Sequence, residues 1–166
     1  MSSAFQFVNV PTGIWIDEQG RVARPGEPAW TTSRTSTFGG KQLVTEGEPY
    51  VAALRDWVAN GNRSPYVLSG AEFARRVKPR TANEMEAEAS FKLAVWLTRA
   101  GNTARGREYF KRAQQLNPDD WNYHRQDWSF TPEEAGKLWL EKFQNLETPY
   151  YPKLEIKPEG TKPPGR

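Results

Sequence analysis

Residues 5–22 read FQFVNVPTGIWIDEQGRV. The aromatic and β-branched side chains at the start of this stretch favour a strand over residues 5–10, which the following proline ends. The continuous apolar run Ile-Trp-Ile predicts a second strand over residues 13–17, buried on both faces. The turn Asp-Glu-Gln-Gly follows, with Gly20 suited to a positive φ angle, and a third, short strand returns over residues 21–24. The stretch therefore predicts a strand that runs into a proline, followed by a β-hairpin.

A long loop is predicted between this hairpin and the first helix. Residues 24–48 are rich in glycine, proline, serine and threonine, and loops of this length are uncommon unless a function or a contact orders them. Trp30 and Phe38 are expected to anchor the loop on the core. A helix is predicted over residues 49–60, because its apolar residues share one face and Asn-Gly follows as a stop signal.

The rest of the chain is predicted to be mostly helical, because its helix starts are well marked. Helices are predicted near residues 70–78 and 131–146, and the second of them carries an apolar stripe. A proline-rich tail over residues 148–166 is predicted to be extended or disordered. Capping boxes mark three helix starts: Ser69 with Glu72, Thr81 with Glu84, and Thr131 with Glu134.

The composition excludes several classes of site. The 166 residues contain no cysteine, so they form no disulfide, no thiolate metal site and no thiol nucleophile. The single histidine, His124, cannot form a histidine metal cluster, and no loop of alternating Asp and Asn suits calcium. We therefore expect neither a metal nor a cofactor.

The charge and hydropathy patterns argue against nucleic-acid and membrane partners. The chain has 23 basic and 20 acidic side chains and a net charge of +3. Its densest basic group, within residues 75–80, is interpreted as a solvated helix end, since nucleic-acid binding needs basic residues clustered on one face. No run approaches the ~20 apolar residues that span a bilayer, and residues 1–4 lack the pattern of a secretory signal. We expect a cytoplasmic location.

No hydrolytic or phosphate-binding motif emerges. The Gly-Gly-Lys sequence at residues 39–41 lacks the strand and the earlier glycine of a P-loop. His124 lies in the aromatic context WNYHR, which predicts a packing role. The two aspartates at residues 119–120 are interpreted as helix-terminal residues.

Residues 87–120 read AEASFKLAVWLTRAGNTARGREYFKRAQQLNPDD and resemble a 34-residue tetratricopeptide repeat (TPR). The resemblance implies a two-helix hairpin, and Gly106 replaces the usual alanine at the close contact between the two helices. One repeat cannot bury its own apolar face, so the flanking helices are expected to pack against it. The other matching positions are Leu93, Ala94, Leu97, Gly101, Phe110, Ala113 and Pro118.

The same resemblance implies a candidate partner-binding face. The family reads peptides with its first helix, which here carries Phe91, Val95 and Arg99. The family's charged clamp for peptide carboxylates is missing, because apolar side chains occupy its positions. Two interpretations stay open: another element of the same chain covers this face, or a peptide or partner protein docks on it.

The sequence Val10-Pro11-Thr12, followed by IWIDEQGRV, resembles the second half of a TlpA/ResA-like thioredoxin-fold protein. The resemblance covers about residues 5–61, interrupted by the predicted loop. It implies that the bond before Pro11 is cis and that Val10 and Thr12 flank a substrate groove. The helix predicted over residues 49–60 would be the last helix of the fold.

The redox centre of that family is missing from these residues. Its two cysteines, or cysteine analogues, stand at the start of the family's first helix, upstream of the matched half. Thiol–disulfide exchange needs one sulfur to attack and another to leave, so we expect this chain not to run that chemistry alone. Three explanations stay open. The chain is a C-terminal piece of a longer redox protein, including a selenoprotein relative; it is a short protein whose half-domain a partner or a second copy completes; or the similarity is shallow and residues 5–60 cap a helical domain.

These observations predict an α+β, mainly helical fold: a partial thioredoxin-like β-hairpin and helix, followed by a TPR-like helical domain. The expected division is a thioredoxin-like segment over residues 1–62, a helical domain over residues 63–147 and an extended tail over residues 148–166. The predicted function is that of an incomplete redox-family protein that is not catalytically competent alone. The alternative is a non-enzymatic protein–protein interaction module built on the TPR-like helices.

Overall fold

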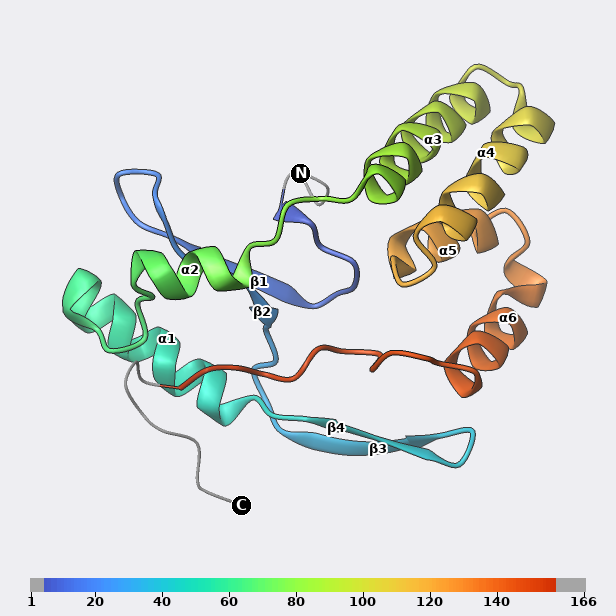
Figure 1. Ribbon diagram of the computed structural model, residues 1–166. Coiled ribbons are helices and arrows are strands. Elements are labelled where there is room, and N and C mark those ends of the chain that lie inside the picture. Colours follow the sequence, from blue (N-terminus) through green and yellow to red (C-terminus); the bar gives the residue numbers. More distant parts are fainter. Residues whose placement is uncertain (1–4, 158–166) are drawn as a thin grey trace. The chain divides into compact units, whose positions relative to one another are not determined.

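The computed structural model describes residues 5–157 and shows a mainly helical α+β protein with two small antiparallel sheets (Figure 1). Each sheet has two strands, paired β1–β2 and β3–β4. The elements of the described chain are β1 (Thr12–Ile16), β2 (Val22–Pro28), β3 (Arg34–Phe38), β4 (Lys41–Thr45), α1 (Glu48–Asn60), the 3₁₀ turn η2 (Gly61–Arg63), α2 (Gly70–Arg76), α3 (Ala82–Arg99), α4 (Thr103–Leu116), α5 (Trp121–Trp128) and α6 (Pro132–Gln144).

The chain divides into two compact units, and each is built from separated parts of the sequence. The sheet unit contains residues 10–78 and the C-terminal segment 151–157, and the helical unit contains residues 5–9 and 79–150. This division differs from the expected boundaries near residues 62 and 148. It differs because α2 belongs to the sheet unit, and because the C-terminal segment packs into that unit.

The core of the sheet unit forms around Trp15, the buried residue of β1. Its indole stacks on Trp57 of α1, with the ring centroids 5.1 Å apart, and its Nε1 donates to the Tyr50 hydroxyl at 3.3 Å. Ile156 of the C-terminal segment packs into the same cluster. The predicted hairpin is confirmed, and Gly20 takes a φ of 77° in its turn.

The loop predicted over residues 24–48 is wrong. β2 continues to Pro28, and residues 34–45 form the β3–β4 hairpin, whose register runs from Arg34 opposite Thr45 to Phe38 opposite Lys41. The two residues between the strands, Gly39 and Gly40, have φ angles of 53° and 79°. Two-residue hairpins with a type I′ turn have positive φ at both central positions, and glycine adopts these angles without steric cost.

The strand predicted over residues 5–10 is also wrong, because the main chain there bonds to a helix. The Val8 carbonyl accepts a hydrogen bond from the Trp121 amide at 2.8 Å, and the Phe7 carbonyl accepts one from Asn122 Nδ2 at 2.6 Å. Amides at a helix start have no partner within the helix. The Val8 carbonyl satisfies such a donor of α5, and residues 5–9 belong to the helical unit.

Helices α3 and α4 form an antiparallel hairpin with a tight turn at Gly101, where φ is 86°. A Cβ atom at Gly106 would clash with Thr98 Oγ1 and would lie 3.0 Å from the Ala94 carbonyl oxygen. The expected close approach of the two helices at Gly106 is therefore confirmed. Phe110, at the centre of this contact region, is fully buried.

Helices α5 and α6 surround Tyr150, at the end of the helical unit. The Tyr150 ring lies edge-on to Trp121 at 4.5 Å and to Phe143 at 5.3 Å, and its hydroxyl accepts from Trp139 Nε1 at 3.1 Å. The main chain of Tyr150 is held by Asn9 Nδ2, which donates to its carbonyl at 2.7 Å. The predicted apolar stripe of α6 is thus the face that packs.

The three predicted helix starts are present, with one difference at the third. Thr81 and Glu84 form a complete capping box, and the Ser69 hydroxyl accepts from the Glu72 amide at 3.2 Å. α6 begins after Thr131 with a proline at its first position, but the Thr131 side chain makes no capping hydrogen bond.

Candidate functional site

The first candidate site is the start of β1, where the sequence predicts a substrate groove. The Val10–Pro11 peptide bond is cis, as the resemblance implies. The Pro11 carbonyl accepts from the Ala29 amide at 3.3 Å, which extends the contact between β1 and the chain after β2. Val10 is 53% exposed, and Thr12 begins β1 and is half-buried.

The main chain at this position already has a partner within the protein. The Tyr151 hydroxyl donates to the Val10 carbonyl at 3.0 Å, and the Tyr151 ring packs edge-on against Trp30 at 5.1 Å. The residue that the resemblance places beside an extended substrate therefore contacts the C-terminal segment of the same chain. A substrate strand that pairs with the Val10 carbonyl would have to share it with Tyr151 or displace Tyr151.

The C-terminal segment continues from there as an extended chain held by the sheet unit (Figure 1). Leu154 and Ile156 pack against the core cluster of Trp15. The residue between them is gripped through its main chain: the Glu155 amide donates to Glu27 Oε2 at 3.2 Å, and its carbonyl accepts from Arg24 at 2.7 Å. Residues whose side chains pack on the core therefore flank a residue that is held through its main chain, which is the alternation of a strand. The partners of this main chain are the side chains of Arg24 and Glu27, however, and not a neighbouring strand.

Arg24 and Glu27 are the buried centre of this contact. Arg24 has no exposed surface and Glu27 is 3% exposed. The Arg24 guanidinium donates to Glu27 Oε1 at 3.0 Å and to the Tyr66 carbonyl at 2.6 Å, and it lies 5.7 Å from the centre of the Trp15 ring. Burial lowers the pKa of Arg24, and the Glu27 carboxylate opposes that change. Each buried charge of the pair is compensated by the opposite charge of its partner, which is the condition under which a protein core keeps charged groups.

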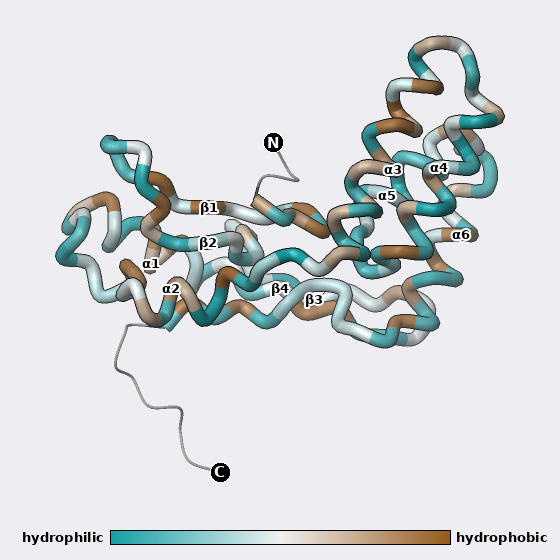
Figure 2. Tube along the Cα trace, turned by 45° about the horizontal axis from the view of Figure 1, so that its top comes forward, coloured by the Kyte–Doolittle hydropathy of each residue, from teal (hydrophilic) through white to brown (hydrophobic). Residues whose placement is uncertain are grey.

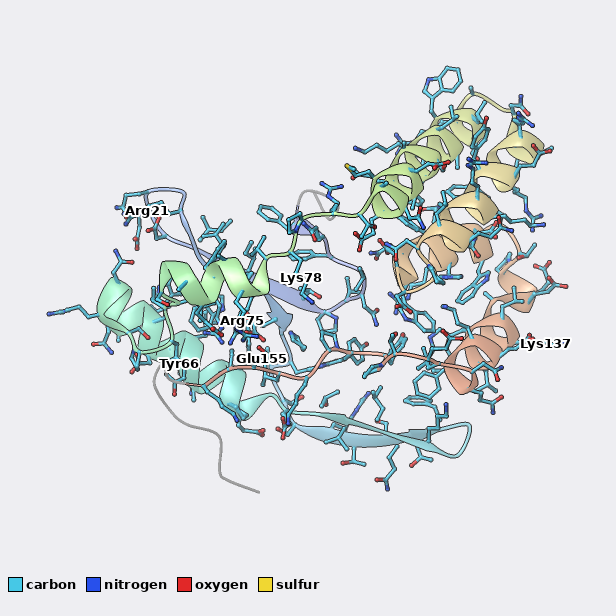
Figure 3. The ribbon with its side chains drawn as sticks, viewed as in Figure 1. Arg21, Tyr66, Arg75, Lys78, Lys137 and Glu155 are labelled. Carbon is cyan, nitrogen blue, oxygen red and sulfur yellow. The ribbon has the colours of Figure 1, made fainter. Side chains whose placement is uncertain are left out.

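α2 closes the same network from the other side. Arg76 donates to Glu27 Oε1 at 2.6 Å and to the Glu155 carbonyl at 3.1 Å, and Arg75 lies 3.6 Å from the Glu155 carboxylate. Figure 3 shows Arg75 and Glu155 close to each other, with Tyr66 nearby. The interpretation of this basic group as a solvated helix end is confirmed for Arg75 and wrong for Arg76, whose side chain is 15% exposed.

Sequence reasoning missed this network, because its members lie far apart in the chain. Glu155 is more than 120 residues from Glu27, and the charged pair Arg24 and Glu27 fell within the predicted loop. The sequence contains one signal of the network, since Arg24 and Glu27 carry opposite charges three residues apart. In the structure both lie in β2, beside the buried Ala23 and Pro28.

The outer edge of β1 is the second feature of the sheet unit. The described sheet has two strands, so β1 pairs on one side only. The Pro11 carbonyl and the Asp17 amide both bond toward the β2 side, and strand alternation then directs the main chain of Ile14 and Ile16 to the opposite edge. The outer edge of β2, in contrast, accepts a hydrogen bond from the Leu68 amide at Ala23.

The three predicted partner-binding residues of α3 have different surroundings. Phe91 packs within the helical unit, with its ring centroid 4.8 Å from Tyr123 and 5.6 Å from Phe110. Val95 is half-buried, and Arg99 is exposed. For Phe91 the interpretation that the same chain covers this face therefore describes the structure.

The exposed apolar residues of α3 lie on its outer face, away from the buried Ala87, Ser90 and Ala94. Figure 2 shows apolar residues recurring along this helix. Leu93, which the resemblance places at the packing contact, is 38% exposed. Spacings of three and four residues put it on one helix face with four other exposed residues: Met85, Ala89, Trp96 and Ala100.

His124 and Asp120 are buried in the helical unit and have opposite pKa changes. His124 Nε2 donates to the Pro118 carbonyl at 2.9 Å; burial, together with the nearby cation of Lys142, lowers its pKa to about 4. Asp120 caps α5 by accepting from the Asn122 amide at 3.0 Å, yet burial raises its pKa to about 6. The predicted packing role of His124 agrees with its contacts with the Trp121 and Trp128 rings, which also contact each other.

The pKa changes of these two groups predict that they alter the free energy of unfolding of the helical unit in opposite directions as the pH rises. Folded Asp120 keeps its proton between pH 4 and 6 while the unfolded chain has lost it, so this group favours folding at pH 4 and loses that contribution as the pH rises to 6. Unfolded His124 binds a proton below pH 6.5 while the folded residue does not until about pH 4, so its contribution is lost as the pH falls. The two slopes nearly cancel in the natural sequence.

Single substitutions separate the two slopes. The helical unit of the His124→Gln variant should be about 2–3 kcal/mol less stable at pH 6.5 than at pH 4, because only the contribution of Asp120 then changes with pH. The helical unit of the Asp120→Asn variant should be more stable at pH 6.5 than at pH 4 by a similar amount, because only the contribution of His124 then changes. Both figures follow from about 1.4 kcal/mol for each pKa unit. Urea denaturation followed by far-UV circular dichroism at several pH values measures both. Slopes of the same sign in the two variants would contradict the assignment.

The described residues hold no group of three or more His, Cys, Asp or Glu side chains placed to bind a metal ion. None of the helices between residues 5 and 157 combines the length and the apolar character needed to cross a membrane. Comparison with known proteins finds no matching family model, no matching curated protein and no matching solved structure.

Proposed function

We propose that the sheet unit is a thioredoxin-like half-domain of the TlpA/ResA-like type, which lacks redox activity alone and works by accepting a strand from a partner. The observation that carries the proposal is the outer edge of β1. This strand contributes the central Trp15 of the core, yet it pairs with β2 alone among the described strands. An open edge beside a buried strand is a template for an added strand.

The small size of the sheet supports the same proposal. An isolated two-stranded hairpin is marginally stable in water, and three or more strands or a packed helix are needed for independent stability. Here α1 covers the Trp15 side, whereas Ile16 at the end of β1 is 43% exposed. A partner strand next to β1 would satisfy the main chain of Ile14 and Ile16 and reduce the exposed area of Ile16.

Hydrogen exchange tests the open edge directly. In the full chain, the amides of Ile14 and Ile16 should exchange at least tenfold faster than the amides of Gly13 and Trp15, which the ladder with β2 protects. Nuclear magnetic resonance resolves these four amides individually. Equal protection of all four amides in the monomer would overturn the proposal, because the edge would then be closed already.

A second measurement tests the redox part of the proposal. The full chain, added to insulin and dithiothreitol, should leave the rate of insulin reduction at the level of the reagent alone, because thiol–disulfide exchange needs a thiolate that the chain lacks. Measurable turnover would overturn the statement that the chain is inactive alone.

The helical unit supports a second candidate function, that of a protein-interaction module. The observation that favours it is the exposed outer face of α3, where Trp96 is 64% exposed and Met85 is 54% exposed. Large apolar side chains grouped on one helix face are typical of surfaces that bind another protein.

A further inference from the structure

The order of large and small residues on the outer face of α3 indicates what kind of partner packs against it. The residues of this face recur at spacings of three and four residues, as one face of a helix does. The opposite, inner side of α3 carries the buried residues Ala87, Ser90 and Ala94. Small residues interrupt the large ones along the outer face, because Ala89 stands between Met85 and Leu93 and Ala100, the C-cap of α3, follows Trp96. A helix packs best against such a face when its own large residues meet the small ones.

The face is complementary to itself in one antiparallel register. If two copies of α3 lie antiparallel with their outer faces in contact, one register sets Trp96 opposite Ala89 of the second copy. The same register sets Met85 opposite Ala100 of the second copy. Trp96 and Met85 of each copy then meet an alanine of the other copy, and the two Leu93 side chains meet near the axis of the two-fold symmetry that most homodimers have.

The charges along α3 favour the same antiparallel arrangement. The first half of the helix carries only acidic charges, at Glu84, Glu86 and Glu88, and the second half carries only basic ones, at Lys92 and Arg99. Antiparallel copies place acidic halves beside basic halves, whereas parallel copies place like charges together. Within the chain, Glu86 already pairs with Arg112 and Glu88 with Arg80 and Lys92, so the charges of α3 add a bias of orientation to these existing pairs. Charge complementarity of this kind fixes the orientation of an interface more than its affinity.

We propose that a second copy of this chain covers the outer face of α3, and that the two α3 helices pack antiparallel with their crossing point near Leu93. This inference rests on the second candidate function and names its partner. The contact of one helix per protomer is smaller than the ~800 Å² per partner of a standard interface, so the dimer should be weak. We expect a dissociation constant of about 10–100 μM.

Sedimentation velocity of the full chain tests the proposal with two matched variants. The average mass should rise toward that of a dimer between about 5 and 500 μM. Trp96→Glu should weaken the association at least tenfold, because it places a charge in the contact. Val58→Glu changes an apolar residue of α1 that is 75% exposed in the sheet unit, and it should leave the association unchanged.

Cross-linking tests the orientation, and the absence of natural cysteines makes single-cysteine variants unambiguous. Leu93→Cys should form a disulfide-linked dimer under mild oxidation, because the two copies of this residue meet near the symmetry axis. Met85→Cys should not, because its two copies would lie about 22 Å apart along the helix axis at 1.5 Å per residue. A mixture of Met85→Cys and Ala100→Cys chains should give the mixed dimer.

The outcomes separate this inference from the functions proposed above. A chain that stays monomeric at 500 μM, or a dimer that Trp96→Glu leaves intact, overturns the second copy as the occupant. Efficient cross-linking of Met85→Cys to itself overturns the antiparallel arrangement. Neither result changes the exchange rates of Ile14 and Ile16, which test the edge of β1 independently.

Discussion

Replacing Glu27 with glutamine should destabilise the sheet unit by about 3–5 kcal/mol. The substitution keeps the size of the side chain and removes the only carboxylate that bonds to both Arg24 and Arg76 in the described structure. Arg24 then stays fully buried without a carboxylate bonded to it, with only the more distant charge of Glu155 nearby, and breaking a buried ion pair from one side costs about this much. Hydrogen exchange of the β2 and α1 amides measures the loss within the sheet unit.

Glu72→Gln provides the matched control. Glu72 also bonds to Arg76, at 3.0 Å, but it lies on the surface of α2 with its second arginine partner. Exposed ion pairs contribute little to stability, so this variant should behave nearly as the natural sequence does. Equal losses from the two substitutions would show that burial does not set the strength of the network.

Ending the chain after Tyr150 should remove the cooperative fold of the sheet unit. The deletion withdraws Leu154 and Ile156 from the core around Trp15, and it leaves Arg24 without the carbonyl of Glu155. Burying one large aliphatic side chain contributes about 1.5–3 kcal/mol, so the two together approach the stability of a small domain. Exchange of the β1 and β2 amides should then become as fast as in an unfolded chain.

A chain that ends after Lys157 is the control for this truncation. It keeps every contact of the C-terminal segment in the described structure, so the sheet unit should keep its protection. The helical unit should remain folded in both truncated chains, because Tyr150 is its last residue. Protected β1 amides in the shorter chain would contradict the role given to the segment.

Features set by neighbouring residues were predictable from the sequence. The hairpin around Gly20 and the capping box of Thr81 and Glu84 depend on contacts within a few residues, and both are present. The β3–β4 hairpin also had a local signal in Gly39 and Gly40, but the abundance of glycine, serine and threonine nearby favoured a loop. That error came from reading the composition of the segment without its two-residue turn.

Features set by distant partners were not predictable in the same way. Residues 5–10 have the side chains of a strand, yet the carbonyls of Phe7 and Val8 bond to α5, more than 110 residues later. The C-terminal segment looked like a proline-rich tail, and only the buried Arg24 and Glu27 explain why Glu155 is held. Propensity describes a segment alone, and tertiary contacts override it.

The dependence of β2 on residues 154–156 also orders the events of biosynthesis. A ribosome releases the chain from its N-terminus, so the strands and α1 emerge long before the segment that completes their core. At about 5–20 residues per second, the stretch between α2 and Ile156 takes roughly 4–16 s to synthesise. During this interval Arg24 and Glu27 lack their last main-chain partner, and the nascent hairpin remains available to chaperones and to other strands.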